Sequence, residues 1–377
     1  MKILFLNPPH IKDKKYIREG RCMQLTSSWA TIWPPLTLMI LASIAEEGGH
    51  KAEIFDANVE PLEFEAVDTL LEGVDVVVLN TAFPSIDSDL EVAKRIKKYN
   101  KAIIIISFGV YFTMLEEEAV PKDRSIDYSI IGEPEETFKE LLVSLEKKTG
   151  QESIDGLMFF DKDGSLKKTA KRALIEDLDS LPKPNRSLIN TEKYILPNNG
   201  ETFTLINTSR GCPYSCTFCI VKVYYGRKIR RHSTEYILDE ITECVDKYNI
   251  KNFLLWEEAF TLDRKVVNDF CNGLAERRLD IKWAVTTRAD SLDIESLRLM
   301  KKMGCFLMGM GIETTSQKIL DGAKKQQKIE DIERGIRLCK EVGLPVMGHF
   351  IFGLPGETKQ TAEDTLKFIK KCDLDYI

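Results

Sequence analysis

Short apolar segments alternate with amphipathic helical stretches along the first 145 residues. Four stretches have helical periodicity, at 36–47, 62–71, 90–99 and 135–145. Between them lie brief segments rich in β-branched residues and bounded by turn residues. These predict strands at 2–6, 52–55, 74–79, 102–106 and 128–131. The alternation predicts an α/β fold, a Rossmann-like doubly wound parallel sheet covered by helices on both faces.

A second series of strands and helices begins at residue 203. Helical stretches follow each of its strands, and Ser233 and Thr234 cap the helix expected at 236–248. The predicted strands are 203–207, 252–256, 282–287, 306–311 and 345–352. Five such units in order predict a partial or complete βα barrel. Residues 373–377 are typical of the approach to a sixth strand, so we expect the barrel to be incomplete there.

A segment of different character separates the two series. It contains a predicted hairpin, 157–160 with a turn at 161–164, and a proline-bearing stretch at 181–186. We therefore expect an N-terminal domain over 1–145, a connector over 146–200 and a C-terminal barrel domain over 201–377.

Composition excludes several classes of protein. Hydrophobic residues make up 43 % of the chain and charged residues 30 %, with a net charge of −6, which argues against a nucleic-acid-binding surface. No apolar run reaches eighteen residues, and the N-terminus enters a strand without a cleavable hydrophobic segment. We expect a cytoplasmic protein with no transmembrane segment.

Three cysteines at close spacing carry the strongest chemical signal. Cys212, Cys216 and Cys219 suit three irons of a 4Fe-4S cluster and leave the fourth iron open to a ligand that is not protein. A disulfide is disfavoured by the odd total of nine cysteines, and zinc would need a fourth ligand nearer than His232. The other cysteines follow no ligand spacing and are predicted to be buried thiols: Cys22, Cys244, Cys271, Cys305, Cys339 and Cys372.

The stretch from Arg210 to Cys219, with Phe218 before the last cysteine, resembles the signature of the radical S-adenosylmethionine (SAM) enzymes. The resemblance implies that the amino and carboxylate groups of SAM chelate the open iron. One electron, from a donor such as flavodoxin or ferredoxin, then cleaves SAM to methionine and a 5′-deoxyadenosyl radical. That radical abstracts hydrogen from the substrate.

Polar residues follow each predicted barrel strand, at the rim where barrel chemistry occurs. Glu257 or Glu258 could accept a hydrogen bond from the SAM ammonium group, and Arg288 could grip its carboxylate. Glu313 could accept from ribose hydroxyls or the ammonium group. Surface ion pairing or helix capping would explain each charged residue singly. The resemblance supports a SAM-binding set of Phe218, Glu257, Glu258, Arg288, Glu313 and Gly353.

Small and polar residues also follow the strands of the first series. Ligands of an open parallel sheet bind at the carboxyl ends of its strands, where these loops gather: 7–9, 80–85, 107–111 and 132–134. Ordinary loop chemistry explains their prolines and glycines equally well. No G-x-G-x-x-G follows the first strand, which weakens a dinucleotide interpretation.

The first 140 residues resemble the cobalamin-binding domain that precedes many radical SAM domains. The resemblance rests on five short segments, Asn7-Pro-Pro9, Trp33-Pro-Pro-Leu36, Glu46-Glu-Gly-Gly-His50, Ile54-Phe-Asp56 and Ile131-Gly-Glu133. It implies a bound cobalamin. The residues that it places at the cofactor are Asn7, Pro8, Thr81, Ser85, Gly109, Val110, Tyr111, Gly132 and Glu133.

The histidines depart from one pattern of cobalamin proteins. None of His10, His50, His232 and His349 lies in the Asp-x-His-x-x-Gly motif that supplies a lower cobalt ligand. Relatives among the radical SAM enzymes commonly lack it too, so the resemblance implies cobalamin without a protein histidine on cobalt. Val110 or Tyr111 is expected to cover the lower face of the corrin.

Together the resemblances predict a cobalamin-dependent methyltransferase that acts on an unactivated carbon, or less often on phosphorus. One SAM would supply the methyl group through cobalamin, and a second would yield the radical. The substrate would be a small molecule or natural product. The alternatives are a non-methylating radical reaction, such as cyclisation or oxidation, and a cofactor-binding sensor without turnover. A methylthiotransferase is disfavoured, because the N-terminal half has only Cys22 for a second cluster.

Overall fold

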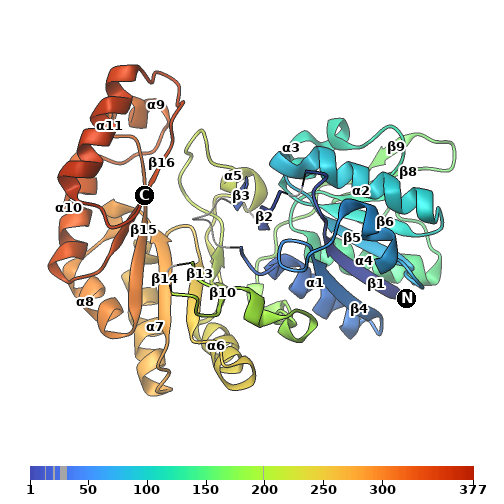
Figure 1. Ribbon diagram of the computed structural model, residues 1–377, viewed down its shortest axis with the longest axis horizontal. Coiled ribbons are helices and arrows are strands. Elements are labelled where there is room, and N and C mark those ends of the chain that lie inside the picture. The colour runs from blue at the N-terminus through green and yellow to red at the C-terminus, as the bar shows by residue number, and fades with distance from the viewer. Residues whose placement is uncertain (13, 20–21, 26–31, 198) are drawn as a thin grey trace. The chain divides into compact units, whose positions relative to one another are not determined.

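The chain folds into two compact units, which we describe from a computed structural model (Figure 1). The structure describes residues 1–377 except 13, 20–21, 26–31 and 198. The first unit comprises Met1–Glu176, Ser180–Thr202 and Val223–Tyr225, and the second comprises Asp177–Asp179, Phe203–Lys222 and Gly226–Ile377.

The first unit is built on a seven-stranded sheet. Its spatial order is β4 (Lys51–Asp56), β1 (Lys2–Asn7), β5 (Val76–Asn80), β6 (Ile104–Phe108), β7 (Tyr128–Ile130), β8 (Leu157–Phe160) and β9 (Leu166–Lys168). The first five strands run parallel, while β8 and β9 add an antiparallel edge. The hairpin predicted at 157–164 is therefore confirmed, and it continues this sheet.

The strand order reverses between β1 and β5, which are neighbours although β4 lies between them in sequence. This is the point at which open α/β sheets bind ligands. The helices of the unit are α1 (Leu36–Glu47), η1 (Phe64–Leu70), α2 (Ile86–Tyr99), α3 (Val110–Leu115) and α4 (Pro134–Lys147). The stretch predicted as helical at 62–71 is a 3₁₀ helix, and only its Val67 is buried.

A hairpin that the sequence did not predict lies between β1 and α1. Its strands are β2 (Tyr16–Glu19) and β3 (Cys22–Leu25), paired antiparallel. All four residues of β2 are buried, including Arg18 and Glu19. Strand prediction relies on alternation of polar and apolar residues, and a strand that buries charged side chains lacks that signal.

The second unit contains a five-stranded parallel sheet. Its strands follow chain order: β10 (Phe203–Asn207), β13 (Asn252–Trp256), β14 (Lys282–Thr287), β15 (Cys305–Glu313) and β16 (Val346–Phe350). The helices are α6 (Thr234–Tyr248), α7 (Arg264–Glu276), α8 (Ile294–Lys302), α9 (Gln317–Gly322), α10 (Ile329–Glu341) and α11 (Lys359–Cys372). Residues of α6, α7, α8, α10 and α11 join one hydrophobic core with these strands.

Short elements complete the chain. The two-residue strands β11 (Ser209–Arg210) and β12 (Arg230–Arg231) pair antiparallel on either side of the cysteine loop, and α5 covers Val221–Tyr224. The remaining 3₁₀ helices are η2 (Phe83–Ser85), η3 (Glu116–Ala119), η4 (Leu178–Ser180), η5 (Arg186–Leu188), η6 (Thr191–Lys193), η7 (Phe260–Leu262) and η8 (Ala289–Ser291).

Residues 373–377, predicted to approach a sixth strand, run beside β16 and meet it through one isolated bridge. Tyr376 forms a parallel bridge with Met347, and its carbonyl accepts from Gly348 N at 2.9 Å. The barrel interpretation of the second unit is confirmed to this extent. None of the helices formed by the described residues is long and apolar enough to cross a membrane.

Candidate functional site

The cysteine loop leaves the second unit's sheet after β10 and is held by its own backbone. Gly211 begins the loop with φ +94°, a conformation that favours glycine. Cys212 N donates to Gly226 O at 3.2 Å, and Cys219 N donates to Cys216 O at 3.2 Å. Thr217 N donates to Ala323 O, which ties the loop to the segment after α9. Of the three cysteines, Cys216 is buried, and Cys212 and Cys219 are partly exposed.

The donor set fits an iron–sulfur cluster better than a single metal ion. Within the described ranges, no three His, Cys, Asp or Glu side chains are arranged around one ion. Thiolates that each bind a different iron must lie farther apart than ligands of one zinc. His232, the zinc alternative, instead contacts Asp179 at 3.0 Å and stacks on Tyr236. Burial lowers the pKa of His232 to about 4, as expected of a structural histidine.

Most of the other cysteines are buried thiols of the core, as predicted. Cys244, Cys271, Cys305 and Cys339 are buried, and burial raises the pKa of Cys271 and of Cys339 to about 12. Cys372 is the exception: it ends α11 and is partly exposed, so that prediction was wrong. The side chain of Cys22 lies outside the described residues.

The two acidic residues after β13 have different surroundings. Glu257 is buried; its carboxylate accepts from Thr208 Oγ1 at 2.7 Å and pairs with Arg231 at 2.6 Å. Burial raises the pKa of Glu257, and the Arg231 charge opposes that rise. Burial raises the pKa of the Cys212 thiol, and the negative charge of nearby Glu258 raises it further.

Arg288 connects three loops at the end of β14. It forms a two-point ion pair with Asp290, at 3.0 and 2.7 Å, and its guanidinium carbon lies 3.7 Å from the ring centre of Tyr214 in the cysteine loop. Two further N–H groups donate to Lys325 O and Gln326 O. Its binding of the SAM carboxylate stays a prediction, because four of its five N–H donors already have partners in the protein.

Glu313 forms a buried ion pair with a residue that the sequence did not single out. Its Oε1 lies 2.6 Å from Lys325 Nζ, and the ammonium group lies 5.9 Å from the ring centre of Phe218. A Cβ on Gly311 would lie 2.6 Å from Glu313 Oε1 and 2.8 Å from Lys325 Nζ, so a larger residue there would require the charged ends of the pair to shift. Glu313 itself has φ +65°.

Lys325 is held by an unusual loop after α9. The residues on both sides of it, Lys324 and Gln326, each have φ +53°. Such conformations are strained for residues other than glycine and cluster at functional sites. Sequence periodicity could not identify Lys325, since it follows the helix as one of two adjacent lysines.

The last predicted SAM residue, Gly353, follows β16. It has φ +94°, and its N–H donates to the carboxylate of Glu357, which precedes the cap of α11. Ile351 N donates to Glu313 O at 2.9 Å, so the ends of β15 and β16 are joined. All predicted SAM residues thus lie at or just beyond the carboxyl ends of neighbouring parallel strands.

The predicted cobalamin loops gather at the equivalent edge of the first unit. Thr81 Oγ1 donates to Phe108 O at 2.7 Å, which joins the loops after β5 and β6. A Cβ on Gly109, whose φ is +130°, would meet Thr81 O at 2.3 Å, so the approach requires glycine. Asn7, the last residue of β1, and Pro8, which follows it, are buried at this edge.

The remaining members of that set support neighbouring segments. Tyr111 packs edge-on against Phe83, with ring centres 5.2 Å apart. Gly132 N donates to Thr113 Oγ1 at 2.9 Å, and Glu133 accepts from Ile175 N at 2.9 Å. Val110 is buried at the start of α3.

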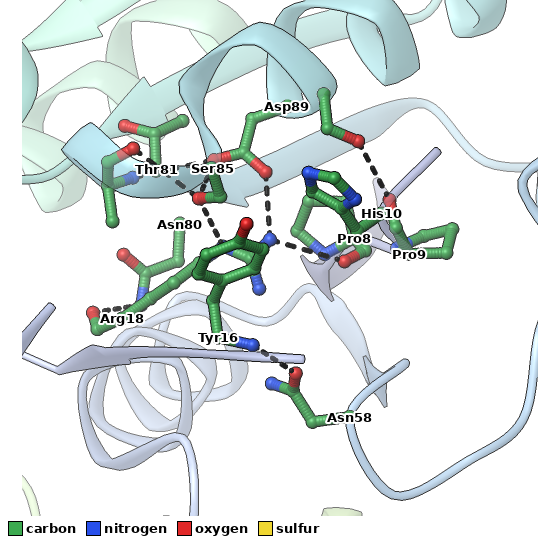
Figure 2. A network of polar contacts seen from close by, with 12 residues as sticks. Pro8, Pro9, His10, Tyr16, Arg18, Asn58, Asn80, Thr81, Ser85 and Asp89 are labelled. Carbon is green, nitrogen blue, oxygen red and sulfur yellow. Dashed lines mark hydrogen bonds and ion pairs between the residues drawn. The ribbon is translucent and has the colours of Figure 1, made fainter. Parts of the chain in front are cut away.

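A buried ionic network, which the sequence did not reveal, lies beside these loops (Figure 2). Arg18 pairs with Asp89 at 2.9 Å, and its Nε donates to Ser85 Oγ at 3.1 Å. Asn80 Nδ2 donates to Arg18 O at 2.9 Å. Ser85, one of the predicted cobalamin residues, belongs to this network because its hydroxyl donates a hydrogen bond to Asp89.

His10, which follows the first strand, has a geometry that disfavours metal binding. Its Nδ1 accepts from Lys12 N at 3.0 Å, so the neutral ring carries its proton on Nε2. Its ring packs on Tyr16, with centres 5.0 Å apart. The expectation that no protein histidine binds cobalt stays a prediction, and this geometry supports it.

Comparison with known proteins shows the family to which the chain belongs. The B12 binding domain family matches residues 25–142, and the Radical SAM superfamily matches residues 206–369. An uncharacterized methyltransferase of Pyrococcus horikoshii is 31 % identical over 382 residues, which cover all of this chain and 79 % of that protein. The chain belongs to the cobalamin-dependent radical SAM enzymes. The family's cofactors are those predicted: a 4Fe-4S cluster, SAM and cobalamin.

Other relatives of this radical SAM enzyme differ in reaction. The anaerobic magnesium-protoporphyrin IX monomethyl ester cyclase of Rubrivivax gelatinosus is 28 % identical over all of this chain, which spans 66 % of that protein. Two solved structures share the fold. The methyltransferase TsrM of Kitasatospora setae has a TM-score of 0.76 at 17 % identity, with 99 % of this chain and 71 % of that one covered. OxsB gives 0.79 at 21 % identity, with 98 % and 51 % covered.

Proposed function

We propose that this enzyme transfers a methyl group from SAM, by way of cobalamin, to an unactivated carbon of a small-molecule or natural-product substrate. The observation that carries the proposal is the presence, in one chain, of an intact cysteine triad and a cobalamin-type strand edge. The relative from Pyrococcus horikoshii, whose match covers all of this chain, is named as a methyltransferase. Phosphorus is the less favoured acceptor.

The residues of the second unit divide the work of binding SAM. Cys212, Cys216 and Cys219 would hold three irons of the cluster, and bound SAM there supplies the adenosyl radical. Glu258 and Glu313 offer carboxylates to the SAM ammonium or ribose groups. Lys325 would form an ion pair with the SAM carboxylate. Its ammonium group is buried beside Phe218 and paired with Glu313.

Arg288 would act mainly by positioning. Its stacking on Tyr214 and its bonds to the carbonyls of Lys325 and Gln326 fix the cysteine loop relative to the Lys325 loop. Gly353 leaves the backbone after β16 open to approach by the adenine. Glu257, which is held by Arg231 and Thr208, would stabilise the carboxyl ends of the strands.

A second function has a specific observation in its favour. Three relatives at 28 %, 28 % and 26 % identity are named as cyclases of magnesium-protoporphyrin IX monomethyl ester, so a radical reaction without methyl transfer is the rival. Both functions need an electron; we propose flavodoxin or ferredoxin as the donor and the cytoplasm as the setting. Nucleic acid is not an expected partner.

The test uses anaerobically reconstituted enzyme, reductant and methyl-deuterated SAM with an extract of small molecules from the source organism. Transfer of the label to a metabolite, dependent on added cobalamin, is the expected result. A metabolite that changes without gaining the label, while 5′-deoxyadenosine accumulates, would establish the rival. If the reduced enzyme cleaves no SAM, both radical reactions are excluded, and the protein is instead a cofactor-binding sensor without turnover.

A further inference from the structure

The hairpin β2–β3 carries Arg18 into the carboxyl edge of the first unit's sheet (Figure 2). The side chains of Arg18 and Asp89 are 1 % and 0 % exposed. Asp89 also accepts from Ser85 Oγ at 2.7 Å, and Arg18 Nη2 donates to Pro8 O at 3.4 Å. The guanidinium group is therefore fixed by partners on three segments: the loop after β1, the loop after β5 and helix α2.

One nitrogen of this fixed group has no partner. Arg18 Nη1 is buried, and no hydrogen-bond acceptor in the described part of the chain reaches it. Leaving a buried charged donor unsatisfied is strongly unfavourable, more so than for a neutral group. A protein that retains such a donor has a partner for it in another state, whether a water or a ligand.

The surroundings of Nη1 indicate which partner. Arg18 borders a cavity of about 10 Å³, which is also lined by Thr37, Asn80, Thr81, Phe108, Gly109, Val110 and Tyr224. A space of that size admits a single water-sized group. Of these lining residues, Thr81, Gly109 and Val110 belong to the set that the family resemblance places at cobalamin. The unsatisfied donor thus borders the edge where the cofactor of this family is expected.

We propose that Arg18 anchors cobalamin, with Nη1 donating to an acceptor oxygen of the bound cofactor while Asp89 and Ser85 hold the guanidinium in place. Cobalamin offers such oxygens on the carboxamide arms of the corrin and on the phosphate of its nucleotide loop. Guanidinium suits both, because its planar N–H fork matches carbonyl and phosphate oxygens. It cannot bind cobalt, since it stays protonated and has no lone pair to give.

The test is the affinity of the full-length protein for cobalamin and for cobinamide, which lacks the nucleotide loop and its phosphate. Arg18→Lys keeps the charge opposite Asp89 but removes the second terminal nitrogen. Losing one charge-assisted hydrogen bond should weaken binding about tenfold or more in spectrophotometric titrations. Arg95→Lys is the matched control, because Arg95 lies on the same helix as Asp89 and pairs with Asp68 at a partly exposed site.

Each outcome bears on the proposal. Equal weakening for both ligands assigns the contact to a carboxamide, and weakening for cobalamin alone assigns it to the phosphate. Unchanged affinity for both, with Arg18→Lys folded and its iron content normal, overturns the proposal and leaves a trapped water in the cavity. If the variant does not fold, hydrogen exchange of the wild type decides. Cobalamin should slow exchange at Tyr16–Glu19, and an unchanged rate there overturns the proposal.

Discussion

Lys325 Nζ lies 2.6 Å from Glu313 Oε1, and the two side chains are 7 % and 9 % exposed. The pair joins the end of β15 to the loop after α9, next to Phe218 of the cysteine loop. Breaking a buried ion pair by removing one partner destabilises a protein by roughly 3–5 kcal/mol, because the other charge is left uncompensated. A ligand with both an ammonium and a carboxylate group can pair with both residues: its ammonium group can take the place of Lys325 beside Glu313, and its carboxylate can take the place of Glu313 beside Lys325.

Lys325→Met is expected to weaken SAM binding by about tenfold or more, because the SAM carboxylate loses its cation. Equilibrium binding to the anaerobic, cluster-loaded protein measures this. Lys324→Met is the matched control, because Lys324 is the adjacent lysine in the same loop and is exposed. If both variants bind SAM as the wild type does, Lys325 has no part in the SAM site.

Gly311→Ala should displace the same ion pair. The new Cβ would lie within 3 Å of both charged atoms, so at least one side chain must move. We expect unit two to lose about 1–3 kcal/mol of unfolding free energy and the protein to bind SAM more weakly. Gly322→Ala serves as the control, since a Cβ there meets nothing within 4 Å. Equal melting temperatures and SAM affinities for the two variants would contradict this placement of the pair.

Single replacement of Cys212, Cys216 or Cys219 by Ala should abolish the cluster and SAM cleavage, because three irons each need one thiolate. Iron and sulfide content and the visible absorption spectrum report the loss. Cys339→Ala, at a buried core position, should keep the full iron content at some expense of stability. Retention of the cluster in any of the three loop variants would contradict the assigned ligands.

Glu19 should make the stability of unit one depend on pH. Burial raises its pKa to about 8, helped by the charges of Asp56 and Glu135 and opposed by hydrogen bonds from Thr37. The folded state then binds a proton that the unfolded state releases. Stability is highest below the unfolded pKa of about 4.5, falls as pH rises to about 8 and is constant above it.

Denaturant unfolding between pH 5 and 9 tests this, with a loss on the order of 3–5 kcal/mol expected across the range. Glu19→Gln mimics the protonated acid and should flatten the curve, becoming more stable than the wild type near pH 9. Glu53→Gln is a suitable comparison, because Glu53 is partly exposed and its pKa is lowered by Lys51 and Lys2. Identical pH profiles for Glu19→Gln and the wild type would show that Glu19 is ionised in the folded state.

The strands of the two parallel sheets were predictable because they are short, largely apolar runs that end in polar loop residues. For β10, β13 and β14 the predicted bounds match the structure to the residue. The cysteine ligands were predicted from their spacing, and the rim positions from those strands, since parallel strands bring their carboxyl ends together. Glu313 and Arg288 could therefore be placed, although their partners could not.

The features that escaped prediction depend on contacts between distant segments. Arg18 belongs to a strand that buries charges, and its partner Asp89 is 71 residues away, in a helix whose pattern is ordinary. Lys325 is positioned by a loop in which Lys324 and Gln326 adopt the left-handed conformation. Neither lysine nor glutamine favours that conformation, so the sequence does not predict it. Such sites become visible only when the chain is folded.

We claim that this enzyme transfers methyl groups by a radical SAM mechanism, and the amounts of two products formed from SAM distinguish this from a radical reaction without methyl transfer. Reduced enzyme holding both cluster and cobalamin, given a substrate that it modifies, should form 5′-deoxyadenosine and S-adenosylhomocysteine in equal amounts, with one methyl group gained per pair. Formation of 5′-deoxyadenosine from a modified substrate without any S-adenosylhomocysteine would contradict the claim.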